Sequence, residues 1–253
     1  MFNVIKGQLS QFIGSHRDPD AVWFLHHIPK TAGSSLASEI SLAEGEESYI
    51  NLVADYGAAG QNYMASLDSL TAHAVERVNG PNPPRVLSGH LGADHVDRLV
   101  TALPQLKLFT FVRHPVARII SEYNYCCSPR HPLNAQFSAR YPTIEEYLAE
   151  PGEMNKIARM MFGTDQIDPK EAVARMMDRY TMIGMQERYP ASFLLMASMI
   201  WEPSMPHKQE RVGAAKAPPS PELTRQIVQA NALDMALFAH VQGGYDTITP
   251  EIW

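Results

Sequence analysis

Cysteine is almost absent from this chain: its only two copies among 253 residues, Cys126 and Cys127, are adjacent. Adjacent cysteines rarely bond to each other, so a disulfide framework is excluded and a reducing, cytoplasmic location is expected. Long apolar runs are missing too, because no segment approaches the roughly 18 uninterrupted apolar residues of a membrane-spanning helix. The first twenty residues also lack the basic and apolar regions of a signal peptide.

Basic charge is likewise scarce. Lysine and arginine number 21 against 27 aspartate and glutamate residues, which leaves a net charge of -6. This balance argues against a surface built to grip nucleic acid, although it is compatible with a local basic pocket for a small anion. The chain is long enough to bury one sizeable core, and it predicts an extension over residues 1–20 and a single domain over residues 21–253. Oligomeric state is not encoded in any pattern that we recognise.

Short apolar strands alternate with helices along the chain. Strands are predicted at residues 21–28, 85–90, 106–113 and 180–185, each bounded by turn-forming residues. Helical patterns lie between and after them, at residues 34–44, 62–78, 93–103, 114–126, 143–149, 153–162, 169–178, 190–200 and 221–241. This alternation predicts an α/β fold with a central, mainly parallel sheet flanked by helices.

The segment Pro-Lys-Thr-Ala-Gly-Ser-Ser, residues 29–35, follows the first predicted strand. A strand that turns into a helix through a small glycine-containing loop presents backbone N–H groups, and the helix dipole adds partial positive charge. Lys30 adds a full charge, and Thr31, Ser34 and Ser35 add hydroxyl donors. The loop therefore predicts a site for a phosphate or similar oxyanion. It is not a Walker A loop, because its lysine precedes its glycine.

These residues and two later segments resemble the sulfotransferase family, in particular the branch of heparan 2-O-sulfotransferases and bacterial carbohydrate-type enzymes. HIPKTAGSSL matches the family's I-P-K-T-[AG]-[GS]-[TS]-S loop, and FVRHPVARIISEYNY matches V-R-[DEHN]-P-x-x-R-x-x-S-x-Y. A Gly-His pair after a short strand, Gly89-His90, is a third match. Weaker similarities continue in the family's order to about residue 245. The departures are mild: His114 replaces a frequent acid, and Ser34 a frequent threonine.

The resemblance implies a P-loop-like fold and the donor 3′-phosphoadenosine 5′-phosphosulfate (PAPS), which has an anionic group at each end. The 5′ end would be bound by the first loop, namely Lys30, Thr31, Ala32, Gly33, Ser34 and Ser35. Arg113 and Ser121 would bind the 3′ phosphate, because arginine forms a bidentate fork and serine adds a donor. The basic segment near residues 207–218 would close over the nucleotide through Arg211, with Lys208 and Lys216 as further candidates.

Two residues are expected to carry the chemistry. Lys30 would stabilise the charge that builds on the oxygen leaving with the phosphate. His90 would be the base that accepts the proton of the acceptor hydroxyl. We expect His26 and His27 to have packing or supporting roles, and no metal site, because no further ligand falls at suitable spacing beside them.

Several residues keep two interpretations. Arg118 would either reach the donor or pair with a carboxylate such as Glu122. Asn155 and Arg159 share a helix face and would line a cleft or face solvent. The aromatic residues of SEYNYCC are expected in the core, and both cysteines are expected to be buried as small apolar side chains.

The sequence thus predicts an enzyme that moves a sulfuryl group from PAPS to an acceptor hydroxyl on a sugar, lipid, metabolite or peptide side chain. Two alternatives stay open. A kinase-like phosphoryl transferase would depend on ATP and magnesium, and the lysine order of the loop counts against it. A non-catalytic protein would hold PAPS or its product PAP without turnover. The acceptor itself cannot be derived, since segments such as residues 44–84 and 128–147 carry no recognisable code.

Overall fold

A computed structural model describes residues 9–53, 61–207 and 218–252. Its strands are β1 (Val22–His26), β2 (Tyr49–Leu52), β3 (Val86–Gly89), β4 (Leu106–Val112) and β5 (Met182–Met185). Its helices are α1 (Leu9–His16), α2 (Gly33–Ser48), α3 (Gln61–Val78), α4 (Ala93–Ala102), α5 (Pro115–Cys126), α6 (Asn134–Arg140), α7 (Ile144–Leu148), α8 (Lys156–Phe162), α9 (Pro169–Arg179), α10 (Tyr189–Ile200), α11 (Pro221–Ala230) and α12 (Ala232–Ile252). Two short 3-10 helices, η1 (Pro151–Glu153) and η2 (Gln186–Arg188), complete the described elements.

All five strands run parallel in the order β2-β3-β1-β4-β5. β1 lies in the centre, and its residue Phe24 aligns with Leu87 of β3 and Leu108 of β4. Every residue of β1 is buried, as expected for a central strand with helices on both faces. The predicted α/β architecture with a parallel sheet is therefore confirmed.

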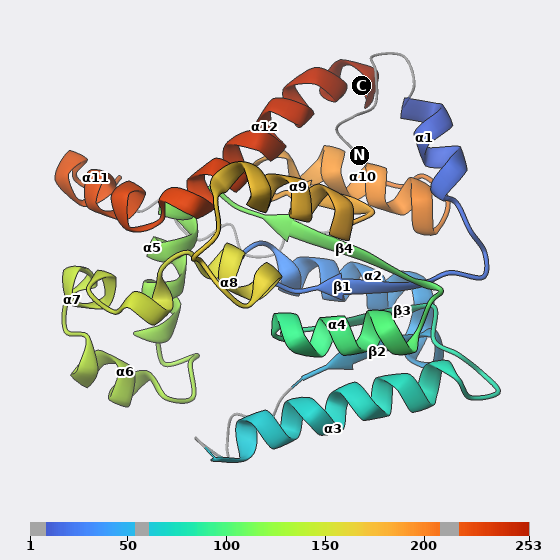
Figure 1. The fold of residues 1–253 in the computed structure, drawn as a ribbon, viewed down its shortest axis with the longest axis horizontal. Helices are drawn as coiled ribbons and strands as arrows, with labels where there is room; N and C mark the ends of the chain where they lie inside the picture. Colours follow the sequence, from blue (N-terminus) through green and yellow to red (C-terminus); the bar gives the residue numbers. More distant parts are fainter. Residues whose placement is uncertain (1–8, 54–60, 208–217, 253) are drawn as a thin grey trace.

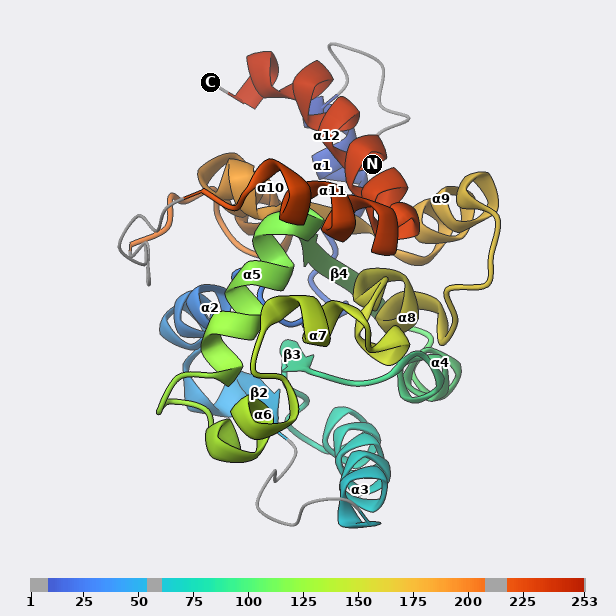
Figure 2. The same cartoon turned by 90° about the vertical axis from the view of Figure 1, so that its left-hand side faces the viewer.

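Helices cover both faces of the sheet (Figures 1 and 2). Helices α2 and α10 lie on one face, and α4, α8 and α9 lie on the other. Helix α5 crosses the edge at which the strands end, and Figure 2 looks directly onto this edge. Helix α12 packs along α8, α9 and β5, and α1 packs against α10. The junctions that follow β1, β3 and β4 therefore open toward one side of the molecule, as ligand sites in parallel sheets do.

Several elements were not predicted, among them α1 and η2, and one prediction was wrong. The sequence did not indicate β2, an edge strand of four residues, or α6, which has no buried residue of its own. The helix predicted at 221–241 is two helices, α11 and α12, because Asn231 interrupts it. The buried Asn231 side chain donates to Ile227 O at 2.9 Å and accepts from Asn155 N at 2.9 Å. These two hydrogen bonds hold Asn231 in a non-helical backbone conformation, so the first helix ends there.

A second apolar cluster lies beside the main core, where α5, α7 and α11 meet. The side chain of Tyr123 packs in it against Phe137 and Tyr147, so this aromatic residue lies in the core as predicted. The two cysteines that follow on α5 and at its end are only half-buried, which corrects the expectation of buried thiols. They lie at the C-terminal end of α5, where the neighbouring residues are half-buried as well.

Candidate active site

The loop between β1 and α2 has an unusual backbone. Lys30 and Ala32 both have positive φ angles, 68° and 81°, in the left-handed region that side chains rarely adopt. The helical hydrogen bonds of α2 begin where Leu36 N donates to Ala32 O at 3.1 Å. The backbone amides at positions 31 to 34 therefore lie at the N-terminal end of the helix, where the helix dipole is positive. The Thr31 hydroxyl fixes the turn by donating to Ile28 O at 2.8 Å. The result is a short run of backbone amides at the start of a helix, an arrangement suited to an anion.

Arg113 joins this loop from the end of β4. Its Nη1 atom donates to the carbonyl oxygen of Lys30 at 3.2 Å, so the strand ends of β1 and β4 are tied together. Burial lowers the pKa of Arg113, and the nearby carboxylate of Glu187 opposes this shift. Glu187 also accepts a bond from His114 N at 2.9 Å, at the start of α5. The sequence did not indicate this role of Glu187.

His90 follows β3 and lies beside the same loop. Its Nδ1 atom donates to the carbonyl oxygen of His27 at 2.6 Å, because a carbonyl can only accept. The neutral ring therefore carries its proton on Nδ1 and leaves a lone pair on Nε2, as a general base requires. Burial lowers the pKa of His90, so the ring is neutral at pH 7, while the carboxylate of Glu122 favours its protonated form.

Helix α5 brings a further residue to the loop. The Lys30 ammonium lies over the ring of Tyr125, with Nζ 4.1 Å from the ring centroid, a cation–π distance. Tyr125 was expected in the core with its neighbours, and this contact corrects that expectation. Ser121 precedes it by four residues and so shares its helix face. The half-buried Ser121 hydroxyl forms no hydrogen bond within the described part of the chain.

Arg118 forms an ion pair within its own helix. It is fully buried and pairs with Glu122 one turn later on α5, which settles its two interpretations in favour of the ion pair. Lys156 from α8 contacts the other oxygen of Glu122 at 2.8 Å and also pairs with Glu153. The charges of Arg118 and Lys156 hold the pKa of Glu122 at about 2 although burial opposes this shift. A buried network of charges thus supports α5 behind the site.

Neither Asn155 nor Arg159 lines a cleft or a plain solvated face. Asn155 Oδ1 accepts from Leu233 N and Asp234 N at 3.2 and 3.3 Å, and thereby caps the start of α12. Arg159 pairs with Asp165 at 2.9 Å. The predicted lid residues Lys208, Arg211 and Lys216 lie outside the described residues.

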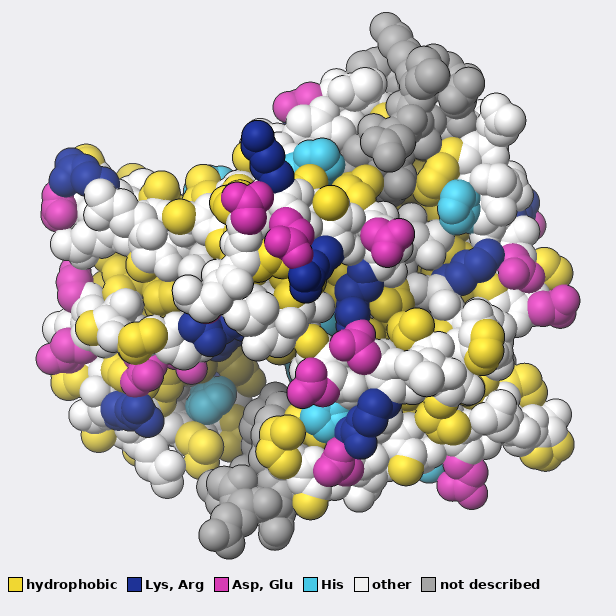
Figure 3. Space-filling model, viewed as in Figure 1, with side chains coloured by type: hydrophobic (Ala, Val, Ile, Leu, Met, Phe, Trp, Pro, Cys, Tyr) yellow, Lys and Arg dark blue, Asp and Glu magenta, His cyan; other side chains and the backbone are white. Residues whose placement is uncertain are grey.

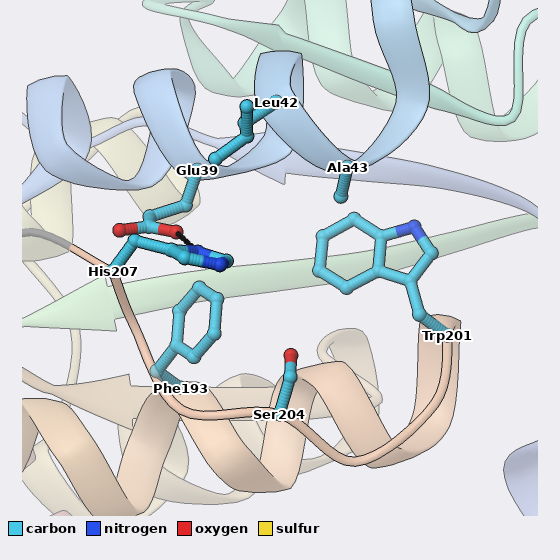
Figure 4. A pocket seen from close by; sticks show the side chains of 7 residues that line it. All are labelled: Glu39, Leu42, Ala43, Phe193, Trp201, Ser204 and His207. Atoms are coloured by element: carbon cyan, nitrogen blue, oxygen red, sulfur yellow. Dashed lines mark hydrogen bonds and ion pairs between the residues drawn. The ribbon is translucent and has the colours of Figure 1, made fainter.

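A separate cavity of about 320 Å³ lies between α2 and the segment that follows α10. In Figure 4, Phe193 and Trp201 face Leu42 and Ala43 of α2, while His207 faces Glu39. His207 Nδ1 lies 3.0 Å from an oxygen of the buried Glu39 carboxylate, so this contact holds the segment against α2. None of the residues placed around the loop lines this cavity.

Basic and acidic side chains are interspersed on the face drawn in Figure 3. Within the described ranges, no helix combines the length and apolar character needed to cross a membrane. The same residues contain no group of three or more His, Cys, Asp or Glu side chains arranged to hold a metal ion. The most distinctive feature of the described structure is therefore the loop of residues 29–35, here called the anion loop for the ligand that its amides suit, with an arginine and a neutral histidine from the two neighbouring strands.

An α/β fold with such a loop after its first strand is typical of enzymes that bind phosphate-bearing substrates. A model of the sulfotransferase family matches residues 16–162, more than half of the sequence. The chain belongs to the sulfotransferase family and is an enzyme that transfers a sulfuryl group. The predicted resemblance to the sulfotransferase family is thereby confirmed.

A solved structure of another sulfotransferase has a similar fold. A sulfotransferase from Alicyclobacillus acidocaldarius superimposes with a TM-score of 0.52 at 15% identity, over 87% of this chain and 95% of the other. Mouse sulfotransferase SULT7A1 complexed with PAP gives a TM-score of 0.41 at 12% identity, over 97% and 88%. Among curated proteins, none matches this sequence significantly.

Proposed function

We propose that this sulfotransferase uses PAPS as its donor and transfers the sulfuryl group in line to an acceptor hydroxyl, with Lys30 and His90 as its catalytic residues. The observation that supports this most strongly is the contact of Arg113 with the loop: its guanidinium lies 3.2 Å from Lys30 O. A nucleotide with an anionic group at each end needs cationic groups from two neighbouring strand ends. Strands β1 and β4, which carry the loop and Arg113, are neighbours in the sheet.

The residues fit such a donor. The loop from Lys30 to Ser35 offers backbone amides around a left-handed turn. The Ser121 hydroxyl, which forms no hydrogen bond within the described part of the chain, lies on the face of α5 that also carries Tyr125. PAPS supplies the sulfuryl group, and PAP is the leaving group. Lys30 stabilises the negative charge that develops on the bridging oxygen, while Arg113 and Ser121 bind the 3′ phosphate. Arg211 remains a proposed lid residue on the grounds of sequence alone.

His90 performs the proton transfer in this mechanism. Its Nε2 lone pair accepts the proton of the acceptor hydroxyl as the new oxygen–sulfur bond forms. The Nδ1–H bond to His27 O fixes the ring, and the negative charge of Glu122 stabilises the imidazolium that results. Because the pKa of His90 lies below its ordinary value of about 6.5, the base is ready at neutral pH.

The test is transfer of labelled sulfate from PAPS to a panel of sugar, lipid, phenol and peptide hydroxyl acceptors. We expect Lys30→Ala to reduce transfer by about 10²–10³-fold and His90→Ala by about 10²–10⁴-fold. Lys170→Ala and His73→Ala, which alter exposed residues of α9 and α3, are the matched controls and should retain activity. Undiminished transfer in both site variants would refute the mechanism.

Donor identity is tested without an acceptor, by thermal unfolding with PAP or with ATP and magnesium. PAP should raise the midpoint, since a ligand that binds only the folded state stabilises it. Stabilisation by ATP and magnesium alone would contradict PAPS as the donor. Tight PAP binding together with no transfer to any acceptor would favour a protein that holds the nucleotide without turnover.

A further inference from the structure

The imidazole of His27 lies between the anion loop and the base. Its ring stacks on that of His90, with centroids 3.8 Å apart and an interplanar angle of 28°. On the loop side, a Cβ atom added to Gly33 would lie 1.5 Å from His27 Nε2. The imidazole thus occupies the volume that any side chain at position 33 would need. The backbone of His27 also accepts the bond from His90 Nδ1 at 2.6 Å.

We propose that His27 is a positioning residue, whose ring is a spacer that fixes His90 against the loop of Lys30 and Gly33 and keeps water from one face of the base. This inference rests on the proposed function, because it takes His90 as the base. His27 acts indirectly. It fixes the position of the His90 ring and limits the access of water to it, and it takes no proton itself.

The charges around His27 support a neutral spacer. Burial lowers the pKa of His27 well below its ordinary value, and His90, His26 and Lys30 act in the same direction. The groups that face His90 are this ring, Lys30 of the loop and Glu122 of α5. Since burial is the main cause of the lowered pKa of His90, a gap in place of the His27 ring would admit water and raise that pKa.

The test measures the pKa of the His90 imidazole directly by proton NMR, with its resonance assigned from the spectrum of His90→Gln. His27→Phe keeps a flat ring in the slot, whereas His27→Ala removes it. We expect the pKa of His90 in His27→Phe to remain at the wild-type value. In His27→Ala it should shift upward, toward about 6.5. His73→Ala on the exposed face of α3 should leave it unchanged.

Two outcomes would overturn the proposal: an unchanged pKa of His90 in His27→Ala, or an equal upward shift in His27→Phe. If His27→Ala does not fold, His27→Asn, which also lacks a ring, carries the same expectation. Calorimetric titration of the wild-type protein with PAP is run alongside. Absence of PAP binding would contradict the proposed donor and leave the result on His27 unaffected, because the NMR measurement needs neither donor nor acceptor.

Discussion

Because Gly33 has no side chain, the ring of His27 can pack directly against the loop. The preceding residue, Ala32, already has a left-handed backbone, which costs roughly 1–2 kcal/mol for a residue other than glycine. Such strain persists only where the surroundings impose it, and it tends to occur at ligand sites. The constraint on position 33 is different in kind: it is steric and comes from the ring of His27.

We therefore expect Gly33→Ala to destabilise the fold by about 1–3 kcal/mol, as overpacked substitutions do. It should also weaken PAP binding, because either the ring or the loop must move. The matched control is Gly243→Ala on α12, where an added Cβ meets nothing within 4 Å. That change should stabilise by about 0.5–1 kcal/mol, since alanine is the better helix former. Urea unfolding and calorimetry with PAP measure both effects, and an unaltered Gly33→Ala protein would contradict this account.

Among the elements, helix α5 connects the site to the rest of the molecule. It begins at the end of β4, where His114 N donates to Glu187, and its middle turn is anchored by the buried pair of Arg118 and Glu122. Its later turn places Tyr125 under the ammonium of Lys30. Because a helix is stiff over three turns, the buried pair determines where the later turn stands relative to the loop.

The expected cost of breaking that pair is large. Arg118→Met should destabilise the protein by about 3–5 kcal/mol, because it removes one partner of a buried ion pair and leaves Glu122 with Lys156 alone. The comparison is Arg175→Met, which breaks an exposed pair with Glu171 at the same helical spacing and should cost less than about 1 kcal/mol. Denaturant unfolding measures both. If the two variants lost similar amounts of unfolding free energy, burial of the Arg118 pair would not add to stability as expected.

For the whole molecule, the strand order brings the site together. With β1 between β3 and β4, the loop, His90 and Arg113 lie at three adjacent strand ends. Lys30 of the loop and Arg113 are nevertheless more than 80 residues apart in the sequence. The same packing buries His26 inside the sheet, where its Nε2 donates to Leu91 O at 2.8 Å and its Nδ1 accepts from Tyr180 at 2.6 Å.

This burial makes the stability of the fold depend on pH. Burial lowers the pKa of His26 to about 4, whereas the unfolded chain binds a proton at about 6.5. Below pH 6.5 the unfolded state therefore gains protons that the folded state does not, and stability falls until about pH 4, by up to about 3 kcal/mol from this residue. His26→Gln should be less stable at neutral pH and should lose less stability on acidification. Unfolding free energies at several pH values measure the difference, and identical pH slopes would contradict it.

Most of the strands and helices, the glycine-containing loop with Lys30 and the positions of His90 and Arg113 at strand ends were determined by local sequence. Apolar runs, turn residues and a glycine-containing loop act over a few neighbours, and so they could be read directly. The split of the last helix at Asn231, the pairing of Arg118, the position of Tyr125 under Lys30 and the placement of His27 against Gly33 were decided only by the tertiary structure. Each depends on a partner from a distant segment or on the volume left by packing, and no local pattern specifies either.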